Sequence, residues 1–137
     1  MATSNSTNQL IQPINLIRIL CGLFYFPHVY SKIVGFEGTA GFFASAGLAP
    51  GAVFVSITMV AELLAGIGLT FGILTRYAAL ISTAIMIVAA YAILTVRGLG
   101  WYWAGGGIEY LAFWGLASAI VAWHAWKNKP GASAGHQ

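Results

Sequence analysis

Residues 77–96 form an uninterrupted run without a single charged side chain. A helix of this length rises about 30 Å, which is the thickness of the hydrocarbon core of a bilayer. The rest of the chain has the same character, because 59% of its 137 residues are hydrophobic and only 7% are charged. A soluble domain carries roughly a quarter charged residues. The sequence therefore predicts an integral membrane protein whose surface is solvated mainly by the lipid bilayer.

Three further apolar runs are long enough to be spans, at residues 14–34, 52–73 and 108–126. Together with residues 77–96 they predict an all-α membrane protein, an antiparallel four-helix transmembrane bundle. The connectors between the runs are short or rich in glycine, which is typical of turns between antiparallel neighbours. The membrane domain is expected to cover residues 14–126.

The segments outside the spans are polar or rich in glycine. Residues 1–13 and 127–137 are expected to be a disordered lead-in and a disordered tail, as chain ends often are. Residues 35–51 contain five glycines and Pro50 and are expected to be a linker. Within the first span, Pro27 is expected to kink the helix.

Basic residues predict the orientation of the bundle. Four spans place both termini on one side, and that side carries Arg76, Lys127 and Lys129. The positive-inside rule then predicts that both termini are cytoplasmic. We expect the membrane to be the bacterial inner (plasma) membrane.

Glu62 is the only charged residue between Glu37 and Arg76. A carboxylate within a span is costly unless it is paired, protonated or hydrated, and such residues often mark functional sites. Counting residues along the two helices places Arg18 and Glu62 in the inner half and at mid-depth, respectively. We therefore expect these two side chains to form an ion pair.

A second polar layer is expected nearer the outer face, where the first span ends and the fourth begins. At 100° per residue, the polar residues of the first span form a stripe along one face of the helix. The expected outer cluster consists of Glu109, Lys32, His28 and Tyr25.

Several interpretations of these polar groups remain open. Arg18 and Glu62 could be a structural ion pair that fixes two helices. They could instead position a bound quinone, with His28 exchanging its proton because imidazole titrates near neutral pH. A third possibility is that Glu62 relays protons or lines a path for a small solute.

Other site types find little support in the sequence. The net charge of +3 is scattered and predicts no nucleic-acid surface. His28 and His124 are expected at different depths, which argues against a haem, and no metal or other intrinsic cofactor is expected. The single cysteine, Cys21, excludes an internal disulfide.

Three glycines of the second span are expected to allow close helix packing: Gly66, Gly68 and Gly72.

The order of these motifs resembles that of the DoxX family of small four-span membrane proteins, over about residues 14–126. Two departures are Val29, where the family usually has glycine, and the absence of the family's frequent Gly-x-Gly-x-x-Ser-x-Asp ending. The matching positions are Arg18, Phe26-Pro27-His28, Lys32, Glu62-Leu63-Leu64-Ala65-Gly66, Gly72, Leu74-Thr75-Arg76-Tyr77-Ala78-Ala79 and Glu109.

The resemblance implies a redox setting, because the family is similar to the membrane subunit of archaeal thiosulfate:quinone oxidoreductase. Other relatives are linked to redox stress responses or membrane complexes. We therefore expect a quinone-interacting or anchoring subunit of a membrane redox system. It would be at most a non-catalytic or quinone-reactive subunit, and its electrons would come from a redox partner protein; a homo-oligomer is the other expected assembly. The alternatives are a structural or assembly protein and a proton or solute pathway.

Overall fold

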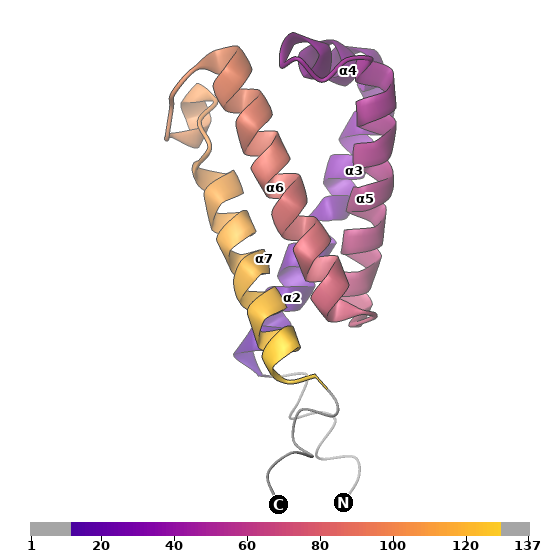
Figure 1. Ribbon diagram of the computed structural model, residues 1–137, viewed down its shortest axis with the longest axis vertical. Coiled ribbons are helices and arrows are strands. Elements are labelled where there is room, and N and C mark those ends of the chain that lie inside the picture. Colours follow the sequence, from indigo (N-terminus) through magenta and orange to yellow (C-terminus); the bar gives the residue numbers. More distant parts are fainter. Residues whose placement is uncertain (1–11, 130–137) are drawn as a thin grey trace, which may run out of the picture.

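The computed structural model describes residues 12–129, and every regular element in that range is helical. Figure 1 shows long helices running side by side, with one short helix across an end of the bundle. The elements are α2 (Pro13–Leu23), α3 (Tyr25–Val34), α4 (Phe36–Ser45), α5 (Gly51–Phe71), α6 (Thr75–Arg97), the 3-10 turn η1 (Trp103–Gly105) and α7 (Glu109–Lys127). Most of the two chain ends that are expected to be disordered lies outside the described residues. The tail is expected to begin at residue 127, but α7 continues to Lys127.

The first predicted span consists of two helices, α2 and α3, that meet at Phe24. The break therefore precedes Pro27, where the kink was expected. Pro27 lies in the first turn of α3, where its missing N–H costs no helical hydrogen bond. Its ring would clash with the carbonyl four residues earlier, at Leu23, which is the last residue of α2. Pro27 therefore interrupts the helix at the residues that precede it.

The linker expected at residues 35–51 is wrong for most of its length, because α4 occupies Phe36–Ser45. This helix is bent by 95° from the α2–α3 segment and crosses the end of the bundle (Figure 1). Phe43 and Ala46 are buried in a small cluster with Val55 of α5 and Ala92 of α6. Burial of these apolar side chains offsets the weak helix propensity of the glycines.

The turn between α5 and α6 needs left-handed backbone at two positions. Gly72 ends α5 with φ of 70° and Leu74 precedes α6 with φ of 47°. The tight turn makes α5 and α6 neighbours, as their short connector predicts. At this turn, a Cβ on Gly68 would lie 2.6 Å from that of Ala78. Glycine is therefore required for the two helices to approach so closely.

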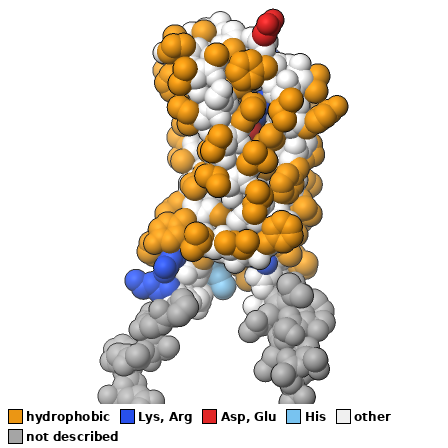
Figure 2. Space-filling view, turned by 90° about the vertical axis from the view of Figure 1, so that its right-hand side faces the viewer, with side chains coloured by type: hydrophobic (Ala, Val, Ile, Leu, Met, Phe, Trp, Pro, Cys, Tyr) orange, Lys and Arg blue, Asp and Glu red, His pale blue; other side chains and the backbone are white. Residues whose placement is uncertain are grey.

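The outer surface of the bundle is apolar. On the face in Figure 2, hydrophobic side chains cover most of the body, while Lys and Arg gather near one end and an acidic side chain projects at the other. Within residues 12–129, the helices Gly51–Phe71 and Thr75–Arg97 are long and apolar enough to cross a membrane, and the bent segment Pro13–Ser45 is a further candidate. Helix α7, which begins at Glu109 and ends at Lys127, is not among these candidates. The four-span bundle therefore stays a prediction.

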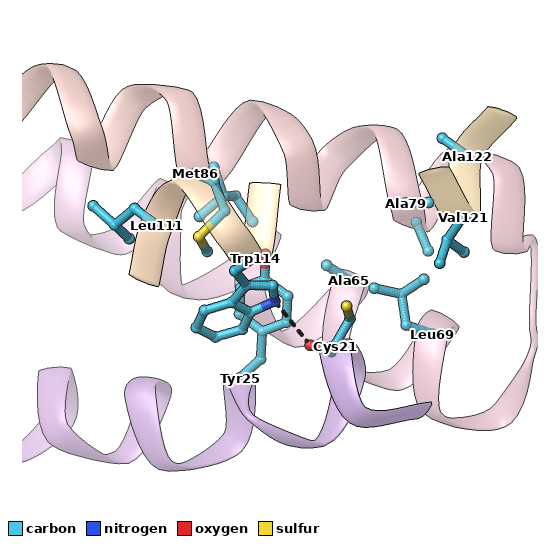
Figure 3. Close-up of a cluster of buried hydrophobic side chains, with 12 residues drawn as sticks. Cys21, Tyr25, Ala65, Leu69, Ala79, Met86, Leu111, Trp114, Val121 and Ala122 are labelled. Atoms are coloured by element: carbon cyan, nitrogen blue, oxygen red, sulfur yellow. Dashed lines mark hydrogen bonds between the residues drawn. The ribbon is translucent and has the colours of Figure 1, made fainter. Parts of the chain in front are cut away.

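The main core lies where α2, α3, α5, α6 and α7 meet. Tyr25, Leu69 and Ala79 are fully buried there, and Trp114 of α7 packs against the Tyr25 ring with centroids 4.6 Å apart. Figure 3 shows the Trp114 indole beside Tyr25 and pointing toward α2. Its Nε1–H donates a hydrogen bond of 3.2 Å to the carbonyl of Cys21. That carbonyl is in the last turn of α2, where helical acceptors lack helical partners.

Candidate functional site

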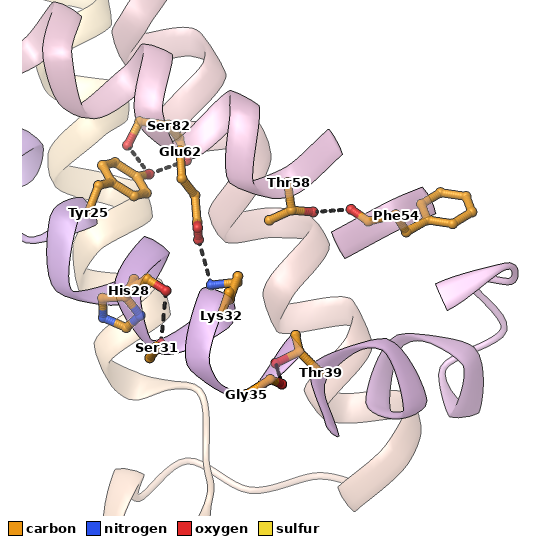
Figure 4. A network of polar contacts seen from close by, with 10 residues as sticks. All are labelled: Tyr25, His28, Ser31, Lys32, Gly35, Thr39, Phe54, Thr58, Glu62 and Ser82. Carbon is orange, nitrogen blue, oxygen red and sulfur yellow. Dashed lines mark hydrogen bonds and ion pairs between the residues drawn. The ribbon is translucent and has the colours of Figure 1, made fainter. Parts of the chain in front are cut away.

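The only ion pair within residues 12–129 joins Lys32 of α3 to Glu62 of α5. Lys32 Nζ lies 2.8 Å from Glu62 Oε1, and the exposed fractions of the two side chains are 15% and 4%. Figure 4 shows the two side chains reaching toward each other from facing helices. The expected ion pair between Arg18 and Glu62 is therefore wrong, because the partner of Glu62 is Lys32.

The direction of side chains on a helix explains this pairing. Each Cα–Cβ bond tilts toward the N-terminal end of its own helix. Since α3 and α5 are antiparallel, the two side chains lean in opposite directions along the bundle axis. Lys32 leans away from α4, and Glu62 leans toward it. The two therefore converge, although their Cα positions are offset along the bundle axis. Arg18 leans away from Glu62 for the same reason.

Arg18 instead binds the C-terminal end of α5. Its Nη1 donates to the carbonyl of Leu69 and, at 3.4 Å, to that of Thr70, while its Nε donates to Asn15 Oδ1 at 3.3 Å. The last carbonyls of a helix lack intrahelical donors and form the negative end of its dipole. Arg18 supplies both a donor and a positive charge there. Its role in this arrangement is to hold α2 against α5.

The expected outer cluster is wrong for Glu109 but not for its other two members, because His28 and Lys32 line the same cavity. The Glu109 carboxylate accepts a hydrogen bond of 2.9 Å from the backbone N–H of Trp103, within the connector that precedes α7. His28 is half-buried, and its ring stacks edge-on to Trp114 with centroids 5.2 Å apart. Tyr25 lies in the same region, but its hydroxyl forms a hydrogen bond with Ser82 of α6.

A buried chain of hydroxyl groups crosses the bundle beside this site. Tyr25 Oη and Ser82 Oγ are 2.6 Å apart, and Ser82 Oγ lies 2.7 Å from Ser118 Oγ. These residues come from α3, α6 and α7, so the chain connects three helices through fully buried groups. Buried hydroxyls need such partners because an unsatisfied polar group is costly.

A cavity of about 450 Å³ adjoins the ion pair, between α3, α5, α6 and α7. Its walls are mostly apolar, and its polar groups come from a few side chains at one side. An apolar cavity with a few converging polar groups is the usual form of a small-molecule site. The polar and aromatic lining residues are His28, Lys32, Phe43, Phe54, Thr58, Glu62, Tyr110 and Trp114.

The three glycines singled out in the sequence have different surroundings. Gly68 faces Ala78 of α6, and Gly66 faces Tyr25, whose Cβ would lie 3.2 Å from an added Cβ. Gly72 is not at a helix–helix contact: it ends α5 in a left-handed conformation and faces the Arg18 guanidinium. Helix α2 also approaches α5 closely at Gly22, a contact that the sequence did not reveal. An added Cβ there would lie 2.6 Å from the backbone nitrogen of Thr70.

Sequence reasoning also missed Trp114, Tyr110 and the two serines. Trp114 was hidden among the tryptophans of α7, which resemble interfacial anchors. Ser82 and Ser118 have small side chains that read equally well as packing residues. Within residues 12–129, no three His, Cys, Asp or Glu side chains form a cluster that could hold a metal ion.

Comparisons with known proteins agree with the resemblance seen in the motifs. The DoxX family profile matches residues 14–97. The Bacillus subtilis (strain 168) protein named "Putative oxidoreductase CatD" is 32% identical over 96 residues, which are 70% of this chain and 68% of that relative. No solved structure matches the chain. With its apolar helices and its match to more than half of the sequence, the chain belongs to the DoxX family of membrane proteins.

Proposed function

We propose that this protein binds a quinone in the cavity beside Lys32 and Glu62, as a subunit or partner of a membrane oxidoreductase. The observation that carries the proposal is an ion pair, buried within apolar helices, at the edge of a cavity of about 450 Å³. Ionisable groups at such a depth are costly and usually serve a function. The name of the Bacillus subtilis relative supports a redox setting.

The side chains of the cavity suit the oxygen atoms of a quinone. Lys32 has three N–H donors, and Glu62 accepts one of them, so two are left for a carbonyl oxygen of the ligand. Glu62 holds the ammonium group in place. His28 lines the same cavity and is the residue that would exchange a proton with the reduced ring. Arg18, which binds the end of α5, has no part in this site.

The redox chemistry belongs to the quinone, which takes up two electrons and two protons when it becomes a hydroquinone. The electrons would come from a partner protein. This chain's residues would hold the ring, exclude water with apolar walls and exchange protons at His28. Apolar surroundings strengthen the hydrogen bonds from Lys32.

The proposed membrane arrangement has four spans, formed by α2–α3, α5, α6 and α7, with α4 at the outer surface. Arg76 stacks on Trp126 at 5.0 Å, and Lys127 stacks on Trp123 at 5.5 Å, at the end where α6 begins and α7 ends. Aromatic residues mark a membrane interface, and basic residues favour the cytoplasmic one. Both termini would then be cytoplasmic, in a bacterial inner membrane.

A structural role is the second candidate, and the buried polar contacts favour it. The pair Lys32–Glu62 and the chain Tyr25–Ser82–Ser118 together connect α3, α5, α6 and α7. A membrane scaffold for assembly of a larger complex would need such contacts and no ligand. A purely structural role does not explain the cavity beside the ion pair.

The test is the quinone content of protein purified in nanodiscs of native lipid. We expect about one quinone per chain above the lipid background, and at least tenfold less in Lys32→Met. Ala61→Phe, which fills the cavity from α5 and retains both charges of the ion pair, should have the same effect. Lys127→Met, which removes an exposed lysine at the far end of α7, should retain the quinone. Wild-type protein with only the background content would overturn the proposal and favour the structural role.

A further inference from the structure

A second hollow of about 610 Å³ lies between α2 and α7. Its lining is almost entirely apolar, and Phe113 and Leu116 at its edge are 77% and 67% exposed. In a protein solvated by lipid, side chains with such exposure contact acyl chains. The hollow is therefore a groove that opens sideways into the bilayer. Its apolar lining residues are Ile17, Leu20, Cys21, Phe24, Phe113, Leu116, Ala117 and Ile120.

The groove and the cavity share one boundary. His28, Tyr110 and Trp114 line both. The Trp114 ring packs against His28 on one side, and its N–H binds the Cys21 carbonyl in α2. A molecule lying in the groove would therefore meet the cavity that holds Lys32 and Glu62 at this boundary.

The dimensions suit an extended chain. From Tyr110 to Ile120 the groove follows α7 for roughly 15 Å at 1.5 Å per residue, about half the hydrocarbon thickness. It runs from the depth of His28 toward the end that carries Lys127. The cavity beside Lys32 and Glu62 extends from the same boundary in the other direction, toward α4.

We infer that the groove between α2 and α7 holds the hydrocarbon tail of the ligand whose polar ring occupies the cavity. The inference rests on the proposed function and narrows the ligand to a lipid-soluble quinone with a long isoprenoid tail. Such a molecule would enter sideways from the bilayer between α2 and α7, ring first, past His28 and Trp114. A water-soluble quinone would have no use for the groove.

The groove should direct the ligand more than it adds to affinity. Lipid tails are as apolar as the leucines of the groove, so moving a tail from lipid into the groove gains little free energy. The decisive measurement is therefore the position of the tail.

The experiment uses two photoreactive quinones in nanodiscs, one with the reactive group on the ring and the other with it on the tail. Labelled peptides are identified by mass spectrometry, with and without excess unlabelled quinone. We expect the ring probe to label α5 and α6 around Glu62 and Ile85. The tail probe should label α2 and α7 around Leu20 and Leu116. Unlabelled quinone should reduce both signals at least fivefold.

Two variants sharpen the result. Ala117→Phe fills the groove and should lower tail labelling at least fivefold. Ala119→Phe makes the same change on the same helix at a residue that lines neither hollow, and should leave the labelling unchanged. Folding of both is checked by thermal unfolding.

The outcomes separate the two proposals. If unlabelled quinone displaces neither probe, the quinone site itself is absent. If it displaces the ring probe while tail labels spread evenly over the lipid-facing helices, the ring site stands and the groove assignment is overturned. Cross-links between two copies of the chain through α2 and α7 would instead assign the groove to a dimer interface, and would likewise overturn it.

Discussion

Lys32 and Glu62 meet because their side chains lean toward each other along antiparallel helices, and their 2.8 Å contact lies within apolar surroundings. Each charge therefore depends on the other for its partner. Removing one member of a buried pair leaves an uncompensated charge, whereas removing both does not.

The first prediction concerns this pair. Glu62→Gln and Lys32→Met should each lower the free energy of unfolding by about 3–5 kcal/mol. The double variant should recover much of that loss, so that the two effects are not additive. Thermal unfolding in detergent measures all three variants. Glu37→Gln, at an exposed position of α4, is the control and should change stability by less than about 0.5 kcal/mol. Additive losses from the two single changes would contradict a direct pair.

The second prediction separates the two cations of the first span. Arg18→Met should leave the carbonyls of Leu69 and Thr70 without their donor and lower the free energy of unfolding by about 1–3 kcal/mol. It should leave the quinone content of folded protein unchanged, whereas Lys32→Met should abolish it. Equal loss of quinone in both variants would place Arg18 in the site after all.

The third prediction concerns the contact between α2 and α5. A Cβ at Gly22 would meet the backbone of Thr70, which cannot move aside without shifting α5. We expect Gly22→Ala to lower the melting temperature in detergent by several degrees. Gly41→Ala is the matched control, because nothing lies within 4 Å of a Cβ there, and it should stabilise α4 by up to about 1 kcal/mol. A neutral Gly22→Ala would contradict the close approach.

The fourth prediction tests the buried hydroxyl chain. Tyr25→Phe removes one hydroxyl and leaves Ser82 bound to Ser118, so it should cost about 0.5–1.5 kcal/mol. Tyr30→Phe makes the same change at a ring that is 68% exposed, and we expect it to be neutral. Comparison of the two variants by thermal unfolding isolates the buried bond. Equal effects would show that burial of the hydroxyl is irrelevant.

The fifth prediction concerns orientation. In a Cys21→Ala background, a cysteine placed at Asn128 should react with a membrane-impermeant maleimide only when the cytoplasmic face is accessible, as in inverted vesicles. A cysteine at Gly38 of α4 should react only in right-side-out spheroplasts. Labelling of both positions from the same side would contradict the four-span arrangement.

The helices themselves could largely be read from the sequence. Runs of apolar residues gave the bounds of α5 and α6 to within two residues, because uninterrupted hydrophobicity is a strong signal in a chain with so few charges. Helix α4 was missed because its glycines predict a loop. Its helix depends on tertiary burial of Phe43 against α5 and α6, which no local pattern records.

The candidate site was harder to predict. Glu62 was identified as a residue in need of a partner, but counting residues along each helix led to Arg18. That count ignores the tilt of side chains toward the helix N-terminus, which brings Lys32 to the depth of Glu62 and carries Arg18 away from it. The part played by Trp114 depends on the rotation of α7 about its axis, and α7 presents tryptophans on more than one face.

Because α4 turns by 95° at the end of the bundle, its length does not extend the first predicted span. The longest helices along the bundle are α5 and α6, which rise about 32 and 35 Å. These lengths match a bilayer of ordinary thickness with little hydrophobic mismatch. A thinner bilayer would be met by tilting of these two helices, and a tilt of α5 against α3 would change the spacing between Glu62 and Lys32.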